Sequence, residues 1–388
     1  MNFFGSSQSM NKTFWKTLPL LSMALALGAQ DPEFAARDKA KNGKQQPACG
    51  LVEGDQCRAR VMPKENGGLL DFALLYWRAE NQGFYSAWHQ TSPFVAVGAA
   101  RSSATSVVRP EAAWDLGFRV GAGWNTAHDQ WAVVANWTWY KNHATNTSTQ
   151  SDITAATADG RGFYPVNSGL FSSGGLVGPY LACNTSWKLW LNAVDLELAR
   201  SYYLTKTLLM KTCWGARGAS LKQKFHSTFT SPSAAVTVAG APSPSPALSE
   251  EAMRQKNKFW GVGPRAGVEA DWTFGKGVSL VGRGAVSLLF GQQKWSSKDK
   301  TLESGNAIAT NGAKSGGMYQ TLAPNLQLFL GLKWGGYFSC DTVYCGVDIG
   351  WEANYWWNQY AIATMTSNVA SGSPVTMEGL TANFHIDF

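Results

Sequence analysis

Apolar and polar side chains alternate along the last nine residues of the chain, 380–388. Leu380, Phe384, Ile386 and Phe388 share one face of this segment, whereas Asn383, His385 and Asp387 share the other. A period of two is typical of a β-strand with one apolar and one polar face. A strand that ends the chain on an aromatic residue is expected in an outer-membrane β-barrel, with its apolar face toward lipid. An edge strand of a soluble sheet is the alternative.

The same alternation recurs upstream. Trp114, Val120 and Trp124 share one face of the segment 114–124, and the segment 131–140 alternates in the same way. Tryptophans at both ends of an outer face are typical of the aromatic girdles of a membrane barrel. Further hairpins are predicted over 188–218, 258–291 and 320–358, with additional strands at 69–80 and 378–388. The sequence thus predicts an all-β, up-and-down antiparallel barrel of about ten strands. The longer gaps could hold further hairpins, so a total of about 12–16 strands is the alternative.

Short and long connections alternate between these strands. The gaps near residues 127, 204, 275 and 339 are short, and the others are long and rich in Ser, Thr, Ala, Gly and Pro. Outer-membrane barrels have short periplasmic turns and long external loops. We therefore predict external loops at 81–112, 142–187, 219–257, 292–319 and 361–377.

The N-terminal residues 1–29 have the features of a cleaved signal peptide. Lys12 and Lys16 precede a short apolar core at 18–27, and small residues suited to cleavage follow. A membrane anchor is the alternative, although the core is short for a membrane span. Residues 30–66 are polar and without a period, so they are interpreted as a periplasmic segment ahead of a barrel over 67–388.

The C-terminal aromatic residue also bears on membrane insertion. A terminal aromatic on an amphipathic strand resembles the insertion signal read by the outer-membrane barrel-assembly machinery. We expect Phe384, Ile386 and Phe388 to form this signal and the machinery to be a partner of the chain.

Composition supports a membrane barrel. Charged residues make up 15% of the 388 residues, against about 25% in typical globular chains. The chain holds 18 Trp and 40 Gly, and its mean hydropathy is −0.18. A helical membrane protein is excluded because no apolar run of about 18 residues exists outside the N-terminus. The net charge of +7 comes from scattered Lys and Arg, which argues against a nucleic-acid partner.

The chain has six cysteines: Cys49, Cys57, Cys183, Cys213, Cys340 and Cys345. Export to an oxidising compartment allows disulfides. Cys49 with Cys57, and Cys340 with Cys345, are close enough in sequence to pair locally, but links between neighbouring subunits are equally compatible with the spacing.

Strand alternation also predicts which charged residues face the lumen. The basic residues are Arg119, Lys211, Arg217, Arg265, Arg283 and Lys333, and the acidic residues are Asp71, Asp115, Asp195, Glu197, Glu269, Asp271, Asp348, Glu352 and Asp387. One interpretation is a pore lining that filters solutes. The alternative is internal ion pairing that holds a narrow barrel together. The mixture of signs argues against strong selectivity for either charge.

Enzymatic chemistry is not indicated. The histidines are His89, His128, His143, His226 and His385, and none lies in a recognisable catalytic motif. His143 and His226, in or near predicted external loops, are the least implausible candidates, and a G-x-S-x-G elbow is missing. The Gly-rich segment 261–267 belongs to an alternating strand rather than to a dinucleotide-binding loop. Its glycines are expected on the lumen face of that strand. We expect neither a cofactor nor a metal.

Several segments resemble the major-outer-membrane-protein-like porins of legionella and of environmental, chlamydia-related bacteria. They are LDFALLYWRAE at 70–80, WDLGFRVGAGWNTAHDQWAVVANWTWY at 114–140, DLELARSYYLTKTLLMKTCWGARGA at 195–219, KFWGVGPRAG at 258–267 and YWWNQ at 355–359. The resemblance covers most of the chain from Leu69 to Phe388. It implies an outer-membrane barrel, pore activity and disulfide-linked assemblies, and it supplies no catalytic motif.

Together these patterns predict a porin of the bacterial outer membrane that lets small hydrophilic solutes diffuse passively. The expected partners are lipid, the barrel-assembly machinery, and further copies or disulfide-linked neighbours. The alternative is a structural or adhesive surface barrel with a plugged lumen, whose loops contact host or neighbouring molecules. Strand number bears on the choice between a pore and a plugged barrel. The interior of a barrel of about eight strands is filled by side chains, whereas a barrel of about 16–18 strands has an open channel.

Overall fold

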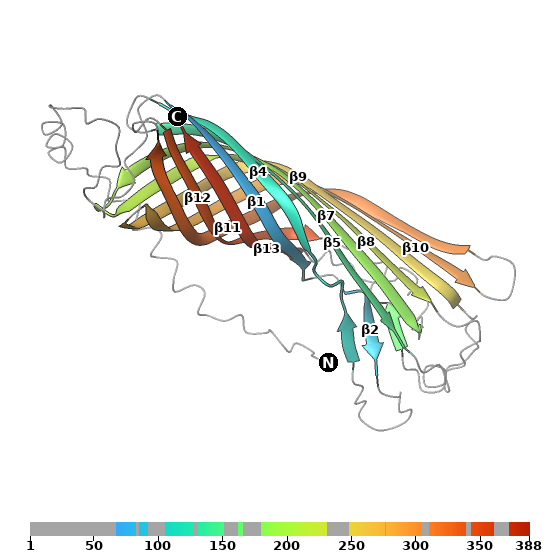
Figure 1. The fold of residues 1–388 in the computed structure, drawn as a ribbon. Helices are drawn as coiled ribbons and strands as arrows, with labels where there is room; N and C mark the ends of the chain where they lie inside the picture. Colours follow the sequence, from blue (N-terminus) through green and yellow to red (C-terminus); the bar gives the residue numbers. More distant parts are fainter. Residues whose placement is uncertain are drawn as a thin grey trace, which may run out of the picture. The chain divides into compact units, whose positions relative to one another are not determined.

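The structure, a computed structural model, describes residues 67–82, 85–91, 105–126, 131–150, 162–165, 180–230, 248–275, 277–303, 310–338, 343–360 and 372–388. These residues form a closed antiparallel barrel of ten strands in the order β1-β13-β12-β11-β10-β9-β8-β7-β5-β4 (Figure 1). The strands are β1 (Gly68–Asn81), β4 (Trp114–Asn125), β5 (Trp131–Thr149), β7 (Ala182–Tyr203), β8 (Leu208–Thr230), β9 (Leu248–Gly275), β10 (Val278–Glu303), β11 (Thr310–Phe338), β12 (Val343–Tyr360) and β13 (Ser373–Asp387). The predicted fold class is confirmed.

The first and last strands close the barrel. β1 pairs with β4 on one side and with β13 on the other, where Leu69 lies opposite Asp387. The backbone N–H of Phe388 donates to the carbonyl oxygen of Gly68 at 2.9 Å. Closure leaves no free edge within the paired part of the wall, as a bilayer requires.

Alternate residues of each strand point outward, and this outer face is apolar. Leu116, Leu330 and Trp334 are more than 60% exposed. In water such a surface would be an aggregation site, but lipid solvates it. The outer faces agree with the predicted ones, including that of the final strand, where Phe384, Ile386 and Phe388 are exposed.

The strands are longer than predicted. β10 and β11 remain paired out to Leu302 and Thr310, inside the loop predicted at 292–319. The other extensions are β5 to Thr149, β7 from Ala182, β8 to Thr230, β9 from Leu248, β12 to Tyr360 and β13 from Ser373. The loop bounds predicted at 142–187, 219–257, 292–319 and 361–377 are therefore wrong. Backbone pairing continues where the outward residues become polar, and the hydrophobic alternation fades there.

Two of the predicted loops contribute a small second sheet. β2 (Ala87–Gln90) lies between β3 (Thr105–Val108) and β6 (Gly162–Pro165). Residues of this sheet are buried together with residues of β7, β8 and β9: Ala87, Val108, Phe163, Tyr180, Cys183, Phe229 and Met253. Because Cys183, Phe229 and Met253 face inward, this sheet packs against the inner side of the extended strands.

Within the segment 261–267, the backbones of two neighbouring strands lie so close together at Gly263 that no side chain fits. A Cβ on Gly263 of β9 would collide with the carbonyl oxygen of Leu288 on β10. Gly263 lies on the inner face, as predicted, and allows a close approach of the two backbones.

The described residues include no helix long and apolar enough to cross a membrane. The predicted signal peptide at 1–29 and the polar segment at 30–66 lie outside the described residues.

Candidate functional site

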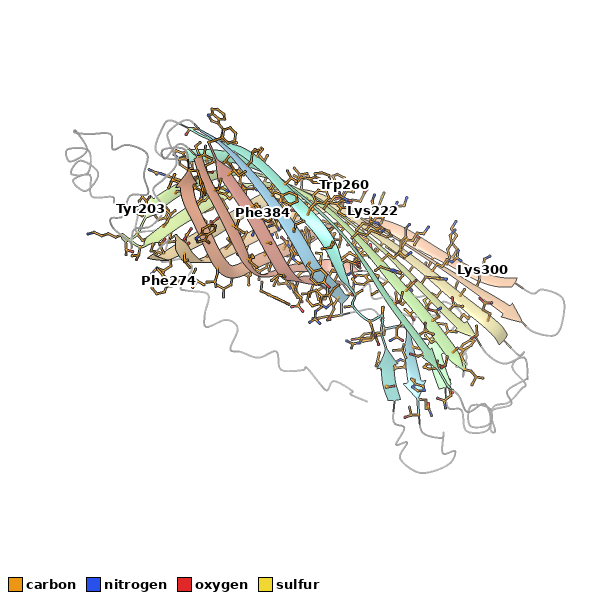
Figure 2. All side chains as sticks on the ribbon, viewed as in Figure 1. Tyr203, Lys222, Trp260, Phe274, Lys300 and Phe384 are labelled. Atoms are coloured by element: carbon orange, nitrogen blue, oxygen red, sulfur yellow. The ribbon has the colours of Figure 1, made fainter. Side chains whose placement is uncertain are left out.

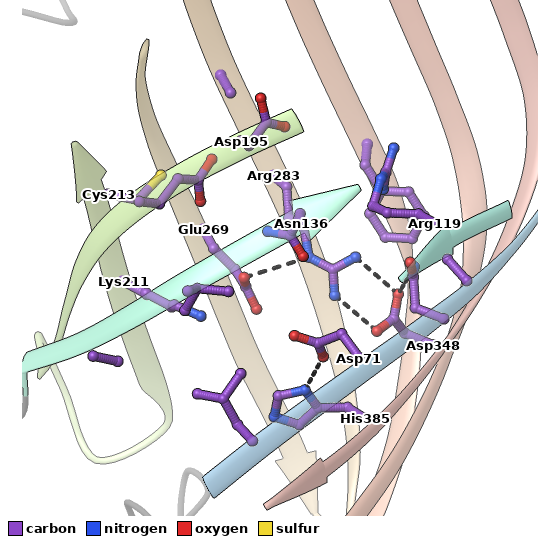
Figure 3. Close-up of a pocket in the computed structure, with 18 of the residues that line it drawn as sticks. Asp71, Arg119, Asn136, Asp195, Lys211, Cys213, Glu269, Arg283, Asp348 and His385 are labelled. Atoms are coloured by element: carbon purple, nitrogen blue, oxygen red, sulfur yellow. Dashed lines mark hydrogen bonds and ion pairs between the residues drawn. The ribbon is translucent and has the colours of Figure 1, made fainter. Parts of the chain in front are cut away.

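The barrel encloses a charged cavity of about 220 Å³ (Figure 3). It lies toward the end of the barrel at which β7–β8, β9–β10 and β11–β12 are joined by short connections, here called the short-turn end. Five basic side chains line it: Arg119, Lys211, Arg265, Arg283 and Lys333. Eight acidic side chains also line it: Asp71, Asp195, Glu197, Glu269, Asp271, Asp348, Glu352 and Asp387. Charges of both signs therefore line the lumen at this end.

Most of these charges form ion pairs between strands, and several pairs reach past one intervening strand. Arg283 on β10 places Nη2 at 2.7 Å from Oδ1 of Asp348 and Nε at 3.4 Å from Oε2 of Glu269. Nζ of Lys333 lies 2.8 Å from Oδ2 of Asp271. Such pairing offsets the cost of burying charge inside the barrel.

A histidine joins two carboxylates at the seam of the barrel. The Nε2 of His385 lies 2.9 Å from Asp387 Oδ1, and its Nδ1 is hydrogen-bonded to Asp71. Figure 3 shows His385 and Asp71 facing each other from β13 and β1. This contact links the first and last strands through side chains as well as backbone.

A second set of ion pairs closes the inner end of the cavity. Arg217 of β8 is 2% exposed, and its Nε donates to Asp195 Oδ1 at 2.6 Å. The same guanidinium donates to Asn325 and, at 3.0 Å, to Gln327 Oε1. Both acceptors belong to β11, so Arg217 reaches across the lumen past β9 and β10.

The rest of this set comes from both walls of the lumen. Nη2 of Arg119 on β4 lies 2.6 Å from Oε1 of Glu352 on β12. Gln327 donates to the same carboxylate at 2.6 Å. Arg265 pairs with Glu197 and donates to Gln327 at 3.0 Å. We call these residues the ion-pair floor: Arg119, Asp195, Glu197, Arg217, Arg265, Gln327 and Glu352.

Beyond the ion-pair floor, apolar side chains fill the barrel. Trp77 lies six residues beyond Asp71 along β1 and is fully buried, as is Trp356 on β12. We call this group the apolar belt: Leu75, Trp77, Tyr140, Trp187, Leu189, Leu191, Phe225, Phe259, Leu289, Trp356, Val375 and Met377. These residues share the inward parity of the charged set.

A layer of carboxamides follows the apolar belt. Asn81 donates to Gln223 at 3.0 Å, and Gln223 and Asn257 both donate to the carbonyl oxygen of Gln359. Gln293 donates to Asn257 at 3.0 Å. The described conformation is thus filled by side chains between the cavity and the far end of the paired wall.

The structure brings together nearly all the residues predicted to face the lumen. All the predicted cations except Arg217 line the cavity, and Arg217 lies in the ion-pair floor. Asp115 is separate, because it accepts hydrogen bonds from Asn142 Nδ2 at 3.0 Å and from the His143 backbone at 2.8 Å. The observed pairing fits the alternative in which these charges hold the barrel together. A pore-lining role stays a prediction.

Sequence reasoning missed the part of Gln327, which donates to Glu352 and accepts from two arginines. It also missed the apolar belt. In both cases inward parity was the available signal, and it was applied to charged residues alone.

The expected disulfides stay predictions, because each local pair has at least one member outside the described residues. Cys183, Cys213 and Cys345 carry free thiols in the structure. Cys183 is buried near the far end of β7, whereas Cys213 lines the cavity at the short-turn end. Cys345 is on β12 on the outer parity, so these three cannot reach one another. Cys49, Cys57 and Cys340 lie outside the described residues.

The histidine candidates are placed apart from one another. His143 lies on the outer face of β5, with its backbone N–H bonded to Asp115. His226 contacts the carbonyl oxygen of Met253 at 3.1 Å. Among the described residues, no group of three or more His, Cys, Asp or Glu side chains is arranged to hold a metal ion.

Several solved structures are distantly similar to this chain. The outer membrane protease OmpT from Escherichia coli is 10% identical, with a TM-score of 0.31 over 83% of this chain and 96% of that chain. The Pseudomonas putida toluene transporter TodX is 10% identical, with a TM-score of 0.26 over 84% and 89%. A Pseudomonas aeruginosa FadL homologue is 8% identical, with a TM-score of 0.27 over 84% and 90%. Such distant likenesses say nothing about activity.

No curated protein matches the chain. The family model of the Legionella pneumophila major outer membrane protein precursor matches residues 62–388. This match covers the whole barrel from β1 to β13. The chain therefore belongs to the family of the Legionella pneumophila major outer membrane protein precursor and is a β-barrel of the bacterial outer membrane.

Proposed function

We propose that this barrel is a narrow porin that passes small hydrophilic solutes and has no enzymatic activity. The observation that carries the proposal is the charged cavity of about 220 Å³ inside the barrel. The described conformation is its closed state, in which the ion-pair floor and the apolar belt block the lumen. Passage requires these side chains to move apart, while the wall stays intact.

The energetics of buried charge support a water-filled role for the cavity. Replacing a buried ion pair by well-packed apolar residues of similar volume is often neutral or stabilising by about 1–4 kcal/mol. A barrel that needed only a stable plug would be served as well by the apolar belt alone. Five cationic and eight acidic side chains around one cavity instead suit hydrated solutes.

The signs of these charges support weak selectivity. Arg283 faces Glu269 and Asp348, and Arg265 faces Glu197, so a permeating ion meets both signs within a few ångströms. The fields of such pairs largely cancel at a distance. Lipid surrounds the barrel, and assembly machinery and further copies of the chain remain proposed partners.

The apolar belt favours a second candidate, a plugged structural or adhesive barrel. Trp77, Trp187 and Trp356 are at most 2% exposed inside the lumen. Barrels of about eight strands are filled by their side chains, and ten strands give a lumen only slightly wider.

Single-channel recording in a planar bilayer separates the two candidates. The purified, heat-modifiable barrel should give discrete conductance steps that scale with salt concentration. Folded protein that inserts into the bilayer yet leaves the current at baseline would rule out the porin and favour the structural barrel.

A further inference from the structure

The outer face of the extended strands carries rows of basic residues. In the first row, Lys258 of β9 lies opposite Lys222 of β8 on one side and Lys294 of β10 on the other. In the second row, Lys224 lies between Lys188 and Lys256. In the third, Lys298 lies between Arg254 and Lys314. These nine residues, all exposed, are called the basic face.

The basic face lacks compensating charge in the described part of the chain. Among the described side chains on this face of the extended strands, Glu250 is the one carboxylate. The described residues provide no ion pair to any of the nine basic residues. Lys224 instead places Nζ 5.0 Å from the ring centroid of Trp190.

This arrangement costs stability unless an anion is bound. Residues directly opposite in an antiparallel pair have Cβ atoms about 4.5–5.5 Å apart, and like charges there are destabilising. Lys222, Lys258 and Lys294 repeat that juxtaposition across three strands. A phosphate group placed between such lysines would attract both of them and so offset the repulsion between their positive charges.

The position of the basic face relative to the membrane identifies the anion. The pair row next to Lys258, toward the middle of the barrel, contains Trp260 and Ser220, and the following row contains Val262 and Phe290. Trp260 and Phe290 are exposed on the outer face. Tryptophan beside an apolar band marks the boundary between hydrocarbon and headgroups.

The first basic row lies at headgroup depth, and the other two rows lie progressively farther out. Two residues along a strand advance about 6.6 Å, which is about 5 Å along the membrane normal at the usual tilt. The rows of Lys258 and Lys256 are therefore about 5 and 10 Å beyond Trp260. Headgroup regions add about 5–8 Å on each side of the hydrocarbon. Figure 2 shows Lys222 close to Trp260, and Lys300 farther out along the same strands.

We propose that the basic face binds the phosphate groups of phosphorylated glycolipid headgroups in the leaflet around this end of the barrel. The lysines act as point charges for phosphate, while the acyl chains of the same lipid pack against Val262 and Phe290. The inference is independent of the porin proposal, because the basic face lies on the outside of the wall.

Binding of lipid A to the full-length folded protein in detergent tests the inference. The probes are lipid A with both phosphates and the same lipid with the phosphates removed, measured by native mass spectrometry. The attraction between one basic residue and an anionic lipid surface changes the affinity for the lipid about fivefold. Lys258→Gln should weaken binding of the phosphorylated lipid about fivefold, and the triple change of Lys222, Lys258 and Lys294 to Gln about 100-fold.

The matched control is Lys206→Gln, an exposed lysine in the turn between β7 and β8 at the opposite end of the barrel. It should leave affinity unchanged, and heat-modifiable migration reports folding of each variant. Equal binding of the dephosphorylated lipid, or equal weakening by Lys206→Gln, would overturn the inference. So would tighter binding of a short DNA duplex than of lipid A, since that would make the basic face a nucleic-acid surface. If the triple variant does not fold, Lys258→Gln alone decides.

Discussion

Arg217 on β8 and Gln327 on β11 are joined by a 3.0 Å hydrogen bond across the lumen, although β9 and β10 separate them in the wall. Nε and Nη2 of the same guanidinium donate to the carboxylate of Asp195 on β7. One side chain thus ties together parts of the barrel that backbone pairing does not join. The lumen is closed by such contacts, and each of them can be removed singly.

Removing one partner of this buried pair should destabilise the barrel strongly. Arg217→Gln removes the hydrogen-bonded cation of Asp195, which is 3% exposed, and leaves it only Arg265, whose Nε lies 3.9 Å from Asp195 Oδ2. Breaking a buried pair in this way costs about 3–5 kcal/mol. Urea unfolding of the refolded protein, followed by tryptophan fluorescence, measures the change in the free energy of unfolding.

The double variant Arg217→Gln with Asp195→Asn is the control for that experiment. It removes both charges, so it should recover most of the lost stability. A double variant as unstable as Arg217→Gln would show that packing around Arg217, rather than uncompensated charge, dominates.

Lumen charges should set what selectivity the open channel has. A charge about 4 Å from a permeating ion interacts with it by about 1–4 kcal/mol, depending on the local dielectric. Changing Arg265 and Arg283 to Gln should therefore move the reversal potential toward cation preference. Val286→Ala, which alters an exposed outer residue of β10, should leave the reversal potential unchanged. An equal shift from Val286→Ala would mean that the assigned inner and outer faces are wrong.

Cys213 offers a chemical test of access to the cavity. Its side chain lines the cavity and its thiol is free. A small cationic methanethiosulfonate reagent added on the short-turn side should attach there and reduce the single-channel current. The Cys213→Ala variant should conduct normally and be insensitive. Loss of current in that variant as well would place the reactive thiol elsewhere.

The sequence was enough to predict the barrel, about ten strands with about 12–16 left open, and which charged residues face inward, because period-two alternation fixes which residues share a face. The partners of those charges were not predictable. Arg119 and Glu352 are 233 residues apart, and which side chains meet across a lumen depends on strand tilt and stagger. These are properties of the closed wall rather than of any one strand.

The filling of the lumen was missed for a different reason. In the segment 70–80, Leu75 and Trp77 are apolar on the face that turns inward, next to Leu74 and Tyr76 on the outer face. A segment that is apolar on both faces carries no alternation to read. The loop bounds failed at the other extreme, where Lys298 and Lys300 made the ends of β10 resemble a polar connection.

The seam between the first and last strands yields the last prediction, that assembly depends on Phe388. Its ring lies over Gly68, where an added Cβ would be 2.8 Å from Cζ of the ring, and its backbone N–H donates to Gly68. Deleting Phe388 removes both contacts, and inserting one residue after Leu380 turns every side chain beyond it to the opposite face. Either change should leave the chain unfolded or degraded. Heat-modifiable migration of outer-membrane fractions on a gel measures how much of the chain is folded. The control variant Phe274→Ala removes an exposed aromatic of β9 away from the seam and should assemble normally. Normal membrane insertion of both altered chains would show that closure needs neither the terminal aromatic nor the register of β13.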